Sequence, residues 1–446
     1  MSKSLSVHSS SDFNQSLLSF LQASPTPFHA TSSMVSILLS AGYTELFEDQ
    51  TWQLEEQAGY FIRRNDSSII AIWLADKSQA LRLVGAHTDS PCLKVKPNAN
   101  LAGKGYFQLG VEVYGGALLA PWFDRDLSLA GRVHARIDGK IESVMVNFER
   151  AIATVPSLAI HLDREANKGR TINPQTQLPP VLSIAGASHL AGKDKDLNSI
   201  LMAEVARQLS KTKAGSEEKL ESILDYELFF YDTQPPAIIG LENEFIASAR
   251  LDNLLSCFIG LQSLLESGKS KNKLLICTDH EEVGSASACG AQGPFLQQVM
   301  ERIWPSNEDR NRIIAGSMMI SADNAHGIHP NFTDRHDQNH GPMLNQGPVI
   351  KVNANQRYAT NSLTSAIFKQ LCDDSGVKYQ TFVTRTDMGC GSTIGPITAS
   401  EVGIETIDIG VPTFGMHSIR ELAGSEDAFE LTKVLKHFFE KASLTE

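Results

Sequence analysis

The chain has 446 residues, of which 42% are hydrophobic and 20% charged, a length and balance that allow two or three packed domains and exclude a disordered or fibrous protein. Its formal net charge of -12 disfavours nucleic acid or an anionic membrane surface as a partner, because both attract basic faces. No apolar stretch approaches the ~20 residues that cross a bilayer, and the first residues lack the pattern of a secretory signal. We therefore expect a cytoplasmic protein without nucleic-acid or membrane partners.

The first 92 residues are expected to begin an α/β domain. Apolar residues at helical spacing predict two helices within residues 11–41, separated by a turn at residues 25–27. Short β-rich runs then predict three strands of a buried sheet, at residues 60–63, 68–75 and 81–86. The third strand leads directly into His87.

Residues 93–237 have a different texture and are expected to form an inserted, mostly β domain. Alternating segments such as GRVHARIDGKIESVMVNF are separated by Gly, Asp and Asn turns, and one helix is predicted at residues 198–209. A polar stretch, KTKAGSEEKLES, follows that helix and predicts a solvated loop or a frayed helix end.

After residue 238 the α/β pattern resumes. It predicts helices at residues 250–267, 294–304, 361–376 and 425–442 and strands at residues 273–278, 317–321, 379–383 and 405–409. Strands that alternate with helices are typical of a largely parallel sheet with helices on both faces. The expected fold is thus an α/β domain with a central, largely parallel mixed sheet, built from residues 1–92 and 238–446 and interrupted by the β insert.

The first candidate site is the segment GAHTDSP, which follows the strand at residues 81–86. In an extended segment, residues two apart point to the same side, so Asp89 can hold one ring nitrogen of His87 while the other nitrogen faces a metal ion. A hydrogen-bonded surface histidine is the ordinary alternative for a His-x-Asp pair.

The second candidate site is TDHEEVG, directly after the strand at residues 273–278. Two adjacent carboxylates cannot face the same way, so Glu281 and Glu282 suit different tasks, one as a free base and the other as a metal ligand. Acidic pairs are usually only solvated, but this pair lies where the carboxyl end of a strand should meet a crevice.

Three further residues complete a possible ligand set. Asp252 in ARLDNL and Asp323 in SADNAH lie at the edges of predicted elements with apolar flanks, and His417 lies in GMHSIRE. Ser418 and Glu421 form an S-x-x-E pattern, which predicts that a helix starts just after His417. Two histidines and several carboxylates, without cysteine, favour zinc, cobalt or manganese in an open catalytic site.

Other hydrolase signatures are absent from the sequence. It contains no H-E-x-x-H pattern of a single-zinc protease, no G-x-S-x-G pattern of a serine hydrolase, and no phosphate-binding P-loop. A pair of ions ~3.5–4 Å apart needs a bridging carboxylate, which this candidate set can supply.

The sequence resembles the M18 family of aspartyl aminopeptidases, within the M28-like clan of two-metal aminopeptidases. The resemblance runs along nearly the whole chain and rests on motifs in this order: PTPFHA, GAHTDSP, GGALLAPWFDRDL, SLAIHL, ARLDNL, DHEEVGS, SADNAHGIHPN, GPVIKVN, QRYATN, CGSTIGP and MHSIRE. The segment from residue 384 to residue 396 resembles the bacterial form of the family, with Met388 and Gly389 where other members differ. This departure concerns residue preference and leaves the ligand positions intact.

The resemblance assigns roles to matching positions. It implies that His87 and Asp323 hold one zinc ion, that Glu282 and His417 hold the other, and that Asp252 bridges the two. Glu281 would be the general base and Asp89 would orient His87. For substrate binding it implies Lys351 as the determinant of an acidic first residue, His329 in or near the pocket, and His161 acting in a neighbouring subunit's active site.

The predicted reaction is hydrolysis of the N-terminal residue, preferentially Asp or Glu, from peptides with a free amine. A metal-activated water would be the nucleophile, with Glu281 accepting its proton. The family assembles as a tetrahedral dodecamer, so the resemblance implies a homo-oligomer in which the β insert is the dimerisation domain. Two other functions stay open, namely a deacylase or carboxypeptidase on a similar two-metal fold, and a metal-stabilised binding protein without catalysis.

Overall fold

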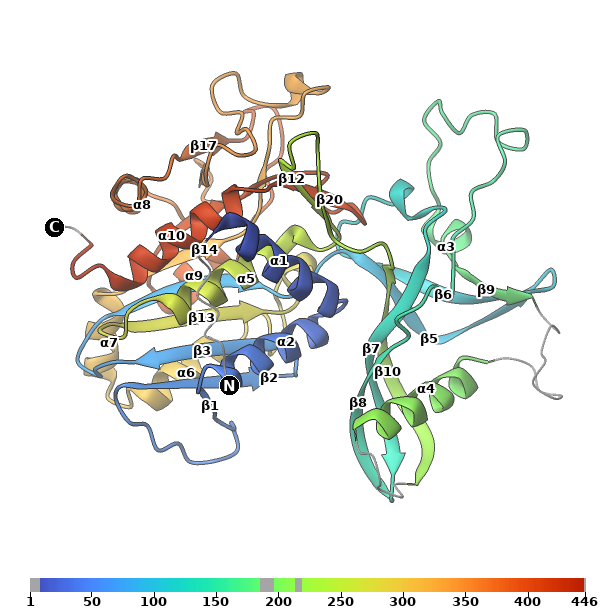
Figure 1. Cartoon of the computed structure of the whole chain (residues 1–446), viewed down its shortest axis with the longest axis horizontal. Coiled ribbons are helices and arrows are strands. Elements are labelled where there is room, and N and C mark those ends of the chain that lie inside the picture. The colour runs from blue at the N-terminus through green and yellow to red at the C-terminus, as the bar shows by residue number, and fades with distance from the viewer. Residues whose placement is uncertain (1–8, 185–195, 213–218, 445–446) are drawn as a thin grey trace. The chain divides into compact units, whose positions relative to one another are not determined.

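The chain forms two compact units. The computed structural model describes residues 9–184, 196–212 and 219–444. The first unit comprises residues 1–90, 236–416 and 420–446, and the second comprises residues 91–235 and 417–419 (Figure 1). The roles predicted for the two parts of the chain, catalysis and dimerisation, stay predictions.

A nine-stranded mixed sheet is the framework of the first unit (Figure 1). In spatial order its strands are β1 (Thr44–Glu45), β2 (Ala58–Arg64), β3 (Ser68–Leu74), β13 (Asn272–Thr278), β4 (Leu81–His87), β14 (Met318–Ala322), β18 (Glu405–Gly410), β16 (Val349–Val352) and β17 (Gln380–Val383). The central strands β13, β4, β14 and β18 run parallel to one another. Antiparallel pairs occur on both sides of this centre, between β3 and β13 and between β18 and β16. The predicted fold class is confirmed.

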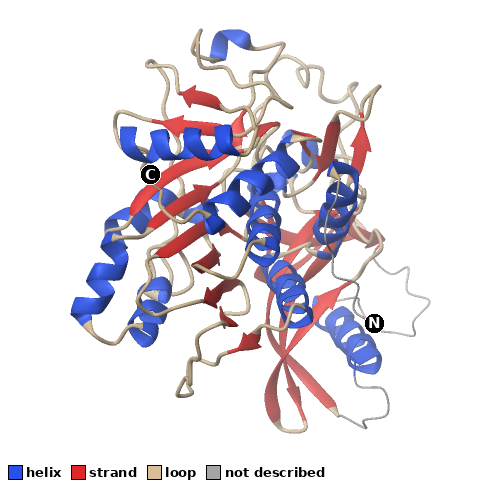
Figure 2. Ribbon diagram, turned by 60° about the vertical axis from the view of Figure 1, so that its left-hand side comes forward, coloured by secondary structure: helices blue, strands red, loops and turns tan. Residues whose placement is uncertain are grey.

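Helices pack on both faces of this sheet (Figure 2). One face is covered by α1 (Ser10–Ala23), α2 (Pro27–Ser40), α5 (Leu251–Glu266), α8 (Ser362–Asp374) and α10 (Asp427–Glu440). The opposite face is covered by α6 (Phe295–Ile303), α7 (Asn307–Ala315) and α9 (Ile394–Val402). The sequence does not predict α7 or α9, because charged residues dominate α7 and Pro396 lies near the start of α9.

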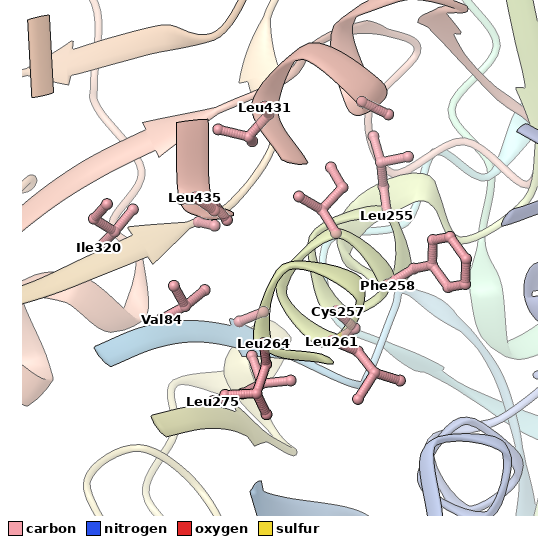
Figure 3. Close-up of a cluster of buried hydrophobic side chains, with 14 of the residues drawn as sticks. Val84, Leu255, Cys257, Phe258, Leu261, Leu264, Leu275, Ile320, Leu431 and Leu435 are labelled. Carbon is pink, nitrogen blue, oxygen red and sulfur yellow. The ribbon is translucent and has the colours of Figure 1, made fainter. Parts of the chain in front are cut away.

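The two cores follow from the alternation of side chains along a strand. In β4, Val84 and Ala86 point into the core beneath α5 and α10, whereas Leu81 and Leu83 point into the core beneath α6. Figure 3 shows the first of these cores, where side chains of α5 and α10 meet β4, β13 and β14. Because the sheet is covered on both faces, every residue of β3, β4 and β13 is buried, and most of these residues are apolar.

A second, five-stranded sheet in the first unit corrects one expectation. Its strands, in spatial order, are β11 (Ala237–Ile239), β12 (Phe245–Ser248), β20 (Glu421–Gly424), β19 (Pro412–Phe414) and β15 (Ala325–His326). The helix predicted to start after His417 is wrong, because strand β20 follows there and pairs with β12. The buried Glu421 side chain accepts the backbone N–H of Asp252 at 2.9 Å, so it does not cap a helix.

The second unit is built on a six-stranded antiparallel sheet. In spatial order its strands are β8 (Lys140–Asn147), β7 (Leu127–Ile137), β10 (Leu220–Asp232), β5 (Cys92–Gly103), β6 (Tyr106–Tyr114) and β9 (Val181–Ile184). It also contains α3 (Pro174–Gln177) and α4 (Leu197–Thr212), the latter at the helix predicted for residues 198–209. Half of the polar stretch after α4, residues 213–218, lies outside the described residues. Along the described chain, no helix combines the length and the apolar character needed to span a bilayer.

Candidate metal centre

Polar side chains converge where the central parallel strands end. His87 is the last residue of β4 and lies opposite Thr278, the last residue of β13. On the other side of β4, Ser321 of β14 lies opposite Gly85, so Asp323, two residues further on, comes level with His87. The carboxyl ends of parallel strands meet at the same edge of a sheet, and this edge carries the residues predicted for catalysis.

The His87 ring is held on one side and faces carboxylates on the other. Its Nδ1 lies 3.1 Å from the backbone oxygen and 3.3 Å from the Oδ1 of Asp89. Its Nε2 lies 3.3 Å from Asp252 Oδ1, 3.5 Å from Asp323 Oδ1 and 3.9 Å from Glu281 Oε2. In metal sites, a ligand histidine commonly has one ring nitrogen fixed by a carboxylate, and the other nitrogen faces the metal. His87 has these surroundings.

Asp89 has a second task that the sequence did not indicate. Its two carboxylate oxygens accept the successive backbone N–H groups of Glu281 and Glu282, each at 3.1 Å. These are the first residues of the short 3₁₀ helix η2 (Glu281–Val283), whose N–H groups have no partner within the helix. One fully buried carboxylate therefore fixes both the His87 ring and the segment that carries the two glutamates.

Asp252 is positioned by its backbone at the start of α5. Its N–H is donated to Glu421, and its carbonyl oxygen accepts the Ser90 hydroxyl at 2.5 Å. The dihedral angles of Asp252 and Asn253 are not helical, so the carboxylate is turned away from the direction that a regular first helical turn would give it. Sequence patterns alone do not indicate such a local departure.

The cluster concentrates negative charge in a buried place. Burial, followed by the charge of Asp252, raises the pKa of Glu282 to about 11, and burial raises the pKa of Glu281 to about 7 against the opposing effect of His87. Burial by itself lowers the pKa of His87, but hydrogen bonds to Asp252, Asp323 and Asp89 outweigh burial and raise it. Buried carboxylates that crowd together in this way are stabilised only by protons or by cations.

The donor set fits divalent metal ions. Ligand atoms of His87, Asp252 and Asp323 lie within 4.8 Å of one another, and so do those of His87, Glu281 and Glu282. Carboxylate oxygens and imidazole nitrogen are suitable ligands for zinc and for manganese, and cations bound there would offset the crowded negative charge. The chemistry of these side chains is therefore that of a metal centre.

Comparisons with known proteins agree with this chemistry. A family model described as aminopeptidase I zinc metalloprotease (M18) matches residues 20–439. The chain belongs to the M18 family. A probable M18 family aminopeptidase 2 of Pseudomonas paraeruginosa is 58% identical over 436 residues, 97% of this chain and 99% of the relative. The protein is accordingly a metallo-aminopeptidase that uses a divalent metal.

Solved M18 structures share the fold. The chain is 37% identical to a protein in the structure of the Ape4 and Nbr1 complex, with a TM-score of 0.91 over 96% of this chain and 86% of that one. It is 27% identical to a chain of the S. cerevisiae mApe1 dodecamer, with a TM-score of 0.81 over 96% of each chain.

One predicted ligand of the M18 site lies in the second unit. His417 belongs to the three-residue segment 417–419, whereas the residues on either side of that segment belong to the first unit. Its Nδ1 lies 3.1 Å from the carbonyl oxygen of Gly116, which also belongs to the second unit. This contact fixes one ring nitrogen of His417, as the Asp89 contact does for His87, and the metal contact itself stays a prediction.

The residues predicted for substrate binding have different surroundings. Lys351 of β16 is buried, with its Nζ 3.4 Å from Asp323 Oδ2 and 5.5 Å from the centre of the Tyr358 ring. His329 lines a pocket of about 300 Å³ together with Tyr358, and its ring lies 5.5 Å from that of Phe414. His161 is exposed in a turn of the second unit.

The pocket beside His329 also contains residues that the sequence did not single out. Arg335 and Arg385 line it, as do His326 and His336. The segment with Met388 and Gly389, whose departure from other family members concerns residue preference, lines it as well. Because these residues come from separate loops, only the folded chain shows that two arginines share one pocket.

Proposed function

We propose that this M18 protein is a two-metal aminopeptidase that removes an N-terminal residue, preferentially Asp or Glu, from peptides. The observation that carries the proposal is the position of His87, whose Nε2 lies within 3.5 Å of carboxylate oxygens of both Asp252 and Asp323 while Asp89 holds its Nδ1. The proposed ligands are His87, Asp252, Glu282, Asp323 and His417, and the proposed ions are zinc, with cobalt or manganese as alternatives.

The contacts of each proposed ligand indicate which of the two ions it would hold. His87 and Asp323 would hold one ion, because their donor atoms lie 3.5 Å apart. Glu282 and His417 would hold the second ion, and Asp252 would bridge the two, since its carboxylate is close to His87 and its charge raises the pKa of Glu282. Metal analysis by mass spectrometry should give two ions per chain for the wild type and fewer for Asp252→Asn. Two ions retained by the variant would refute the bridging role.

Glu281 is the proposed general base. Bound divalent ions supply a water of lowered pKa and polarise the scissile carbonyl group. Glu281 lies beside this centre, and without bound cations burial raises its pKa to about 7. A carboxylate at this place can accept a proton from the water and return it to the leaving amine. Asp89 accepts the backbone N–H of Glu281 and so keeps the Glu281 side chain beside His87. The Asp252 carboxylate is nevertheless closer to His87 Nε2 than the Glu281 carboxylate is.

Two groups of cations support the preference for an acidic first residue. Lys351 is buried beside Asp323, so its ammonium group is close to the proposed ions. Arg335 and Arg385 line the neighbouring pocket, although Arg385 also forms an ion pair with Asp387 at 2.6 Å. A carboxylate in this region would meet positive groups despite the acidic net charge of the chain.

Hydrolysis of a small substrate panel tests the proposed function. Substrates beginning with Asp, Glu, Leu or Lys, each with a free and with an acetylated amine, should be cleaved by metal-loaded protein only when the amine is free and fastest when the first residue is acidic. Lys351→Met should reduce the ratio of kcat/KM for Asp over Leu by about tenfold or more, while Lys378→Met, at an exposed position, should not. Faster cleavage of Leu or Lys substrates by the wild type would refute the acidic preference.

The proposal extends to assembly. A structural neighbour is described as a dodecamer, and we propose a dodecamer built from dimers here as well, with the second unit forming the dimer contact. The exposed His161 of that unit would then serve the active site of a neighbouring subunit. Light scattering should give the mass of an oligomer, and a monomer would refute this part. The cytoplasmic location stays a prediction.

A further inference from the structure

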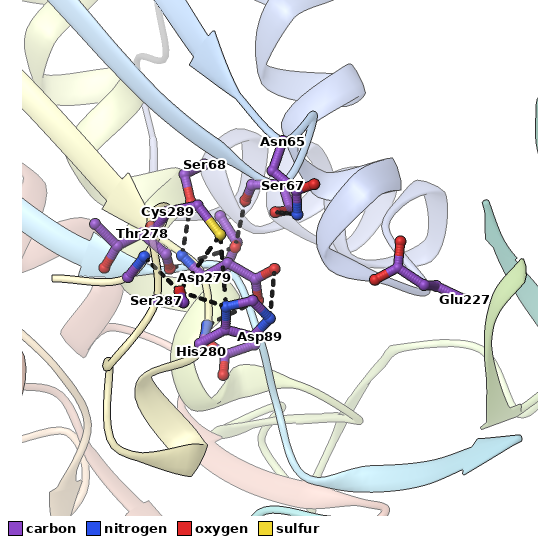
Figure 4. A network of polar contacts seen from close by, with 12 residues as sticks. Asn65, Ser67, Ser68, Asp89, Glu227, Thr278, Asp279, His280, Ser287 and Cys289 are labelled. Atoms are coloured by element: carbon purple, nitrogen blue, oxygen red, sulfur yellow. Dashed lines mark hydrogen bonds and ion pairs between the residues drawn. The ribbon is translucent and has the colours of Figure 1, made fainter. Parts of the chain in front are cut away.

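A second cluster of reactive side chains lies next to the segment that carries Glu281 and Glu282. Asp279 and His280 directly precede Glu281, and Cys289 approaches them from the loop that follows (Figure 4). The His280 Nδ1 lies 2.8 Å from the Ser287 hydroxyl and 3.5 Å from the Cys289 sulfur, while its Nε2 lies 3.6 Å from Asp279 Oδ2. The proposed peptidase chemistry uses none of these side chains.

The arrangement of donors favours an activated thiol over a metal site. A single ion needs its ligands around one nitrogen of the ring, but here the thiol and the carboxylate contact different nitrogens of His280. When a histidine ring lies between a thiol and a carboxylate, the histidine activates the thiol as a nucleophile and the carboxylate orients the histidine. The cluster therefore has the geometry of a reactive cysteine.

The pKa of Cys289 differs in direction from those of two other buried cysteines, Cys257 and Cys372. Burial raises the pKa of the Cys372 thiol to about 12 and raises the pKa of Cys257 as well. Burial also acts on Cys289, but hydrogen bonds to His280 and Ser287 outweigh it, so its pKa lies below the usual value. A larger thiolate fraction at neutral pH makes a cysteine more reactive.

We propose that Cys289 is an oxidation site for small peroxides and that its oxidation slows the peptidase. Cys289 is only 5% exposed, so a molecule as small as hydrogen peroxide fits the site better than a bulky electrophile. The His280 side chain, 28% exposed, provides the approach from solvent.

The reaction balances with peroxide as the oxidant. The thiolate sulfur attacks one peroxide oxygen, the O–O bond breaks, and the departing hydroxide takes up a proton to leave as water. The sulfur is oxidised by two electrons to sulfenic acid, and the peroxide is reduced by two electrons. Solvent supplies that proton, and the His280 ring nitrogen lies 3.5 Å from the sulfur that reacts.

Hydrogen bonds connect the backbone of Cys289 to the peptidase segment. The Ser68 hydroxyl donates to the carbonyl oxygen of Cys289 at 2.8 Å and accepts the backbone N–H of Asp279 at 2.8 Å. An oxygen atom added to the sulfur must displace the His280 ring or the Ser287 hydroxyl, because both are in contact with the sulfur. Either displacement moves the segment that positions Glu281 and Glu282.

The first test compares cysteines within the same protein. Metal-loaded protein is treated with hydrogen peroxide and denatured in the presence of dimedone, and each cysteine peptide is quantified by mass spectrometry. Cys289 should be oxidised about tenfold faster than the more exposed Cys92 and Cys390. Oxidation that follows exposure, with Cys92 and Cys390 reacting first, would overturn the proposal.

The second test removes the activating ring. His280→Gln should slow the oxidation of Cys289 to the rate of Cys92, measured by mass and independent of peptidase activity. The control His437→Gln removes a histidine that also contacts an aspartate, Asp374, and should leave the rate unchanged. Equal rates in the wild type and His280→Gln would show that the ring does not activate the thiol.

The third test links oxidation to activity. Peptidase activity of the wild type should fall in step with the sulfenic acid at Cys289, whereas Cys289→Ser should start with normal activity and keep it under the same peroxide treatment. Full activity in protein oxidised at Cys289, or equal losses in both proteins, would refute the effect on the peptidase.

Discussion

Two of the places where the first unit buries carboxylates do so in opposite ways. Asp427, at the start of α10, is 0% exposed, yet its Oδ1 accepts the N–H of Gly347 at 2.8 Å and its Oδ2 that of Asn345 at 2.6 Å. At the ends of β4 and β14, by contrast, the carboxylates of Asp252 and Asp323 face one histidine nitrogen and lie near two glutamates. The protein supplies two backbone hydrogen-bond donors to the first site. In the second site, apart from the Lys351 ammonium 3.4 Å from Asp323 Oδ2, it concentrates negative charge.

The pKa values express this difference. Burial raises the pKa of Asp427 to about 7 although two N–H groups act against it, whereas burial and the charge of Asp252 raise that of Glu282 to about 11. A buried acid with its own donors is part of the fold, because the backbone stabilises it. A group of buried acids near one another is complete only when cations are bound, which is the physical mark of a metal site.

Metal removal should give the largest effect and separate the two sites. Chelation should abolish peptidase activity and lower the Tm of the wild type, since ions that bind only the folded state stabilise it. Glu282→Gln should have nearly the Tm of the wild type once both are chelated at pH 7, because the Glu282 carboxyl is then already protonated. Thermal unfolding with and without metal provides the measurement. A chelated Glu282→Gln protein far less stable than the chelated wild type would show that Glu282 is a structural residue.

The general base gives the next largest effect. Glu281→Gln should lower kcat by about 10²–10⁴-fold, because proton transfer is lost while the backbone contact to Asp89 is kept. Metal content and Tm should match those of the wild type, which distinguishes loss of the base from loss of a ligand. Glu308→Gln, at an exposed position on α7, serves as the control. Retained turnover in Glu281→Gln would refute the assigned role.

Asp89 lies between the two kinds of buried acid, and its replacement sharpens the comparison. It accepts two backbone N–H groups, as Asp427 does, but it also holds His87. Asp89→Asn should weaken metal binding by about 10–100-fold, the usual range for residues that orient a metal ligand. Titration with zinc in a competing chelator measures this change. Unchanged affinity would place Asp89 with Asp427 among purely structural residues.

The sequence was informative wherever a local pattern carries the structure. Apolar runs predicted β3, β4 and β13, and the polar residues that follow β4 and β13 indicated the edge where His87 and Glu281 lie. Local patterns failed where long-range pairing decides, as in strand β20, where Glu421 holds the backbone of Asp252 across 169 residues. The contact between Cys289 and His280 was not predicted either, because nothing in the sequence places Cys289 beside the DHEEVGS motif that contains His280.

The smallest predicted effect concerns Asp427 and the pH dependence of stability. An acid whose pKa is higher in the folded than in the unfolded protein binds its proton more tightly when folded, so stability falls as pH rises between the two values. For Asp427 this window runs from the ordinary value of 3.8 to about 7. Across it, the free energy of unfolding of the wild type should decrease relative to that of Asp427→Asn.

Urea unfolding of the chelated proteins at several pH values isolates this contribution, because titration of the metal ligands is then common to both proteins. The amide keeps one acceptor for the N–H groups of Asn345 and Gly347 but cannot ionise, so a constant difference between the two proteins across the window would mean that the backbone donors hold Asp427 charged throughout. If the difference in the free energy of unfolding changes with pH, two hydrogen-bond donors do not fully offset the cost of burying the charged Asp427 carboxylate. That result would make the cluster at the ends of β4 and β14, which has carboxylates where Asp427 has donors, still more dependent on bound cations.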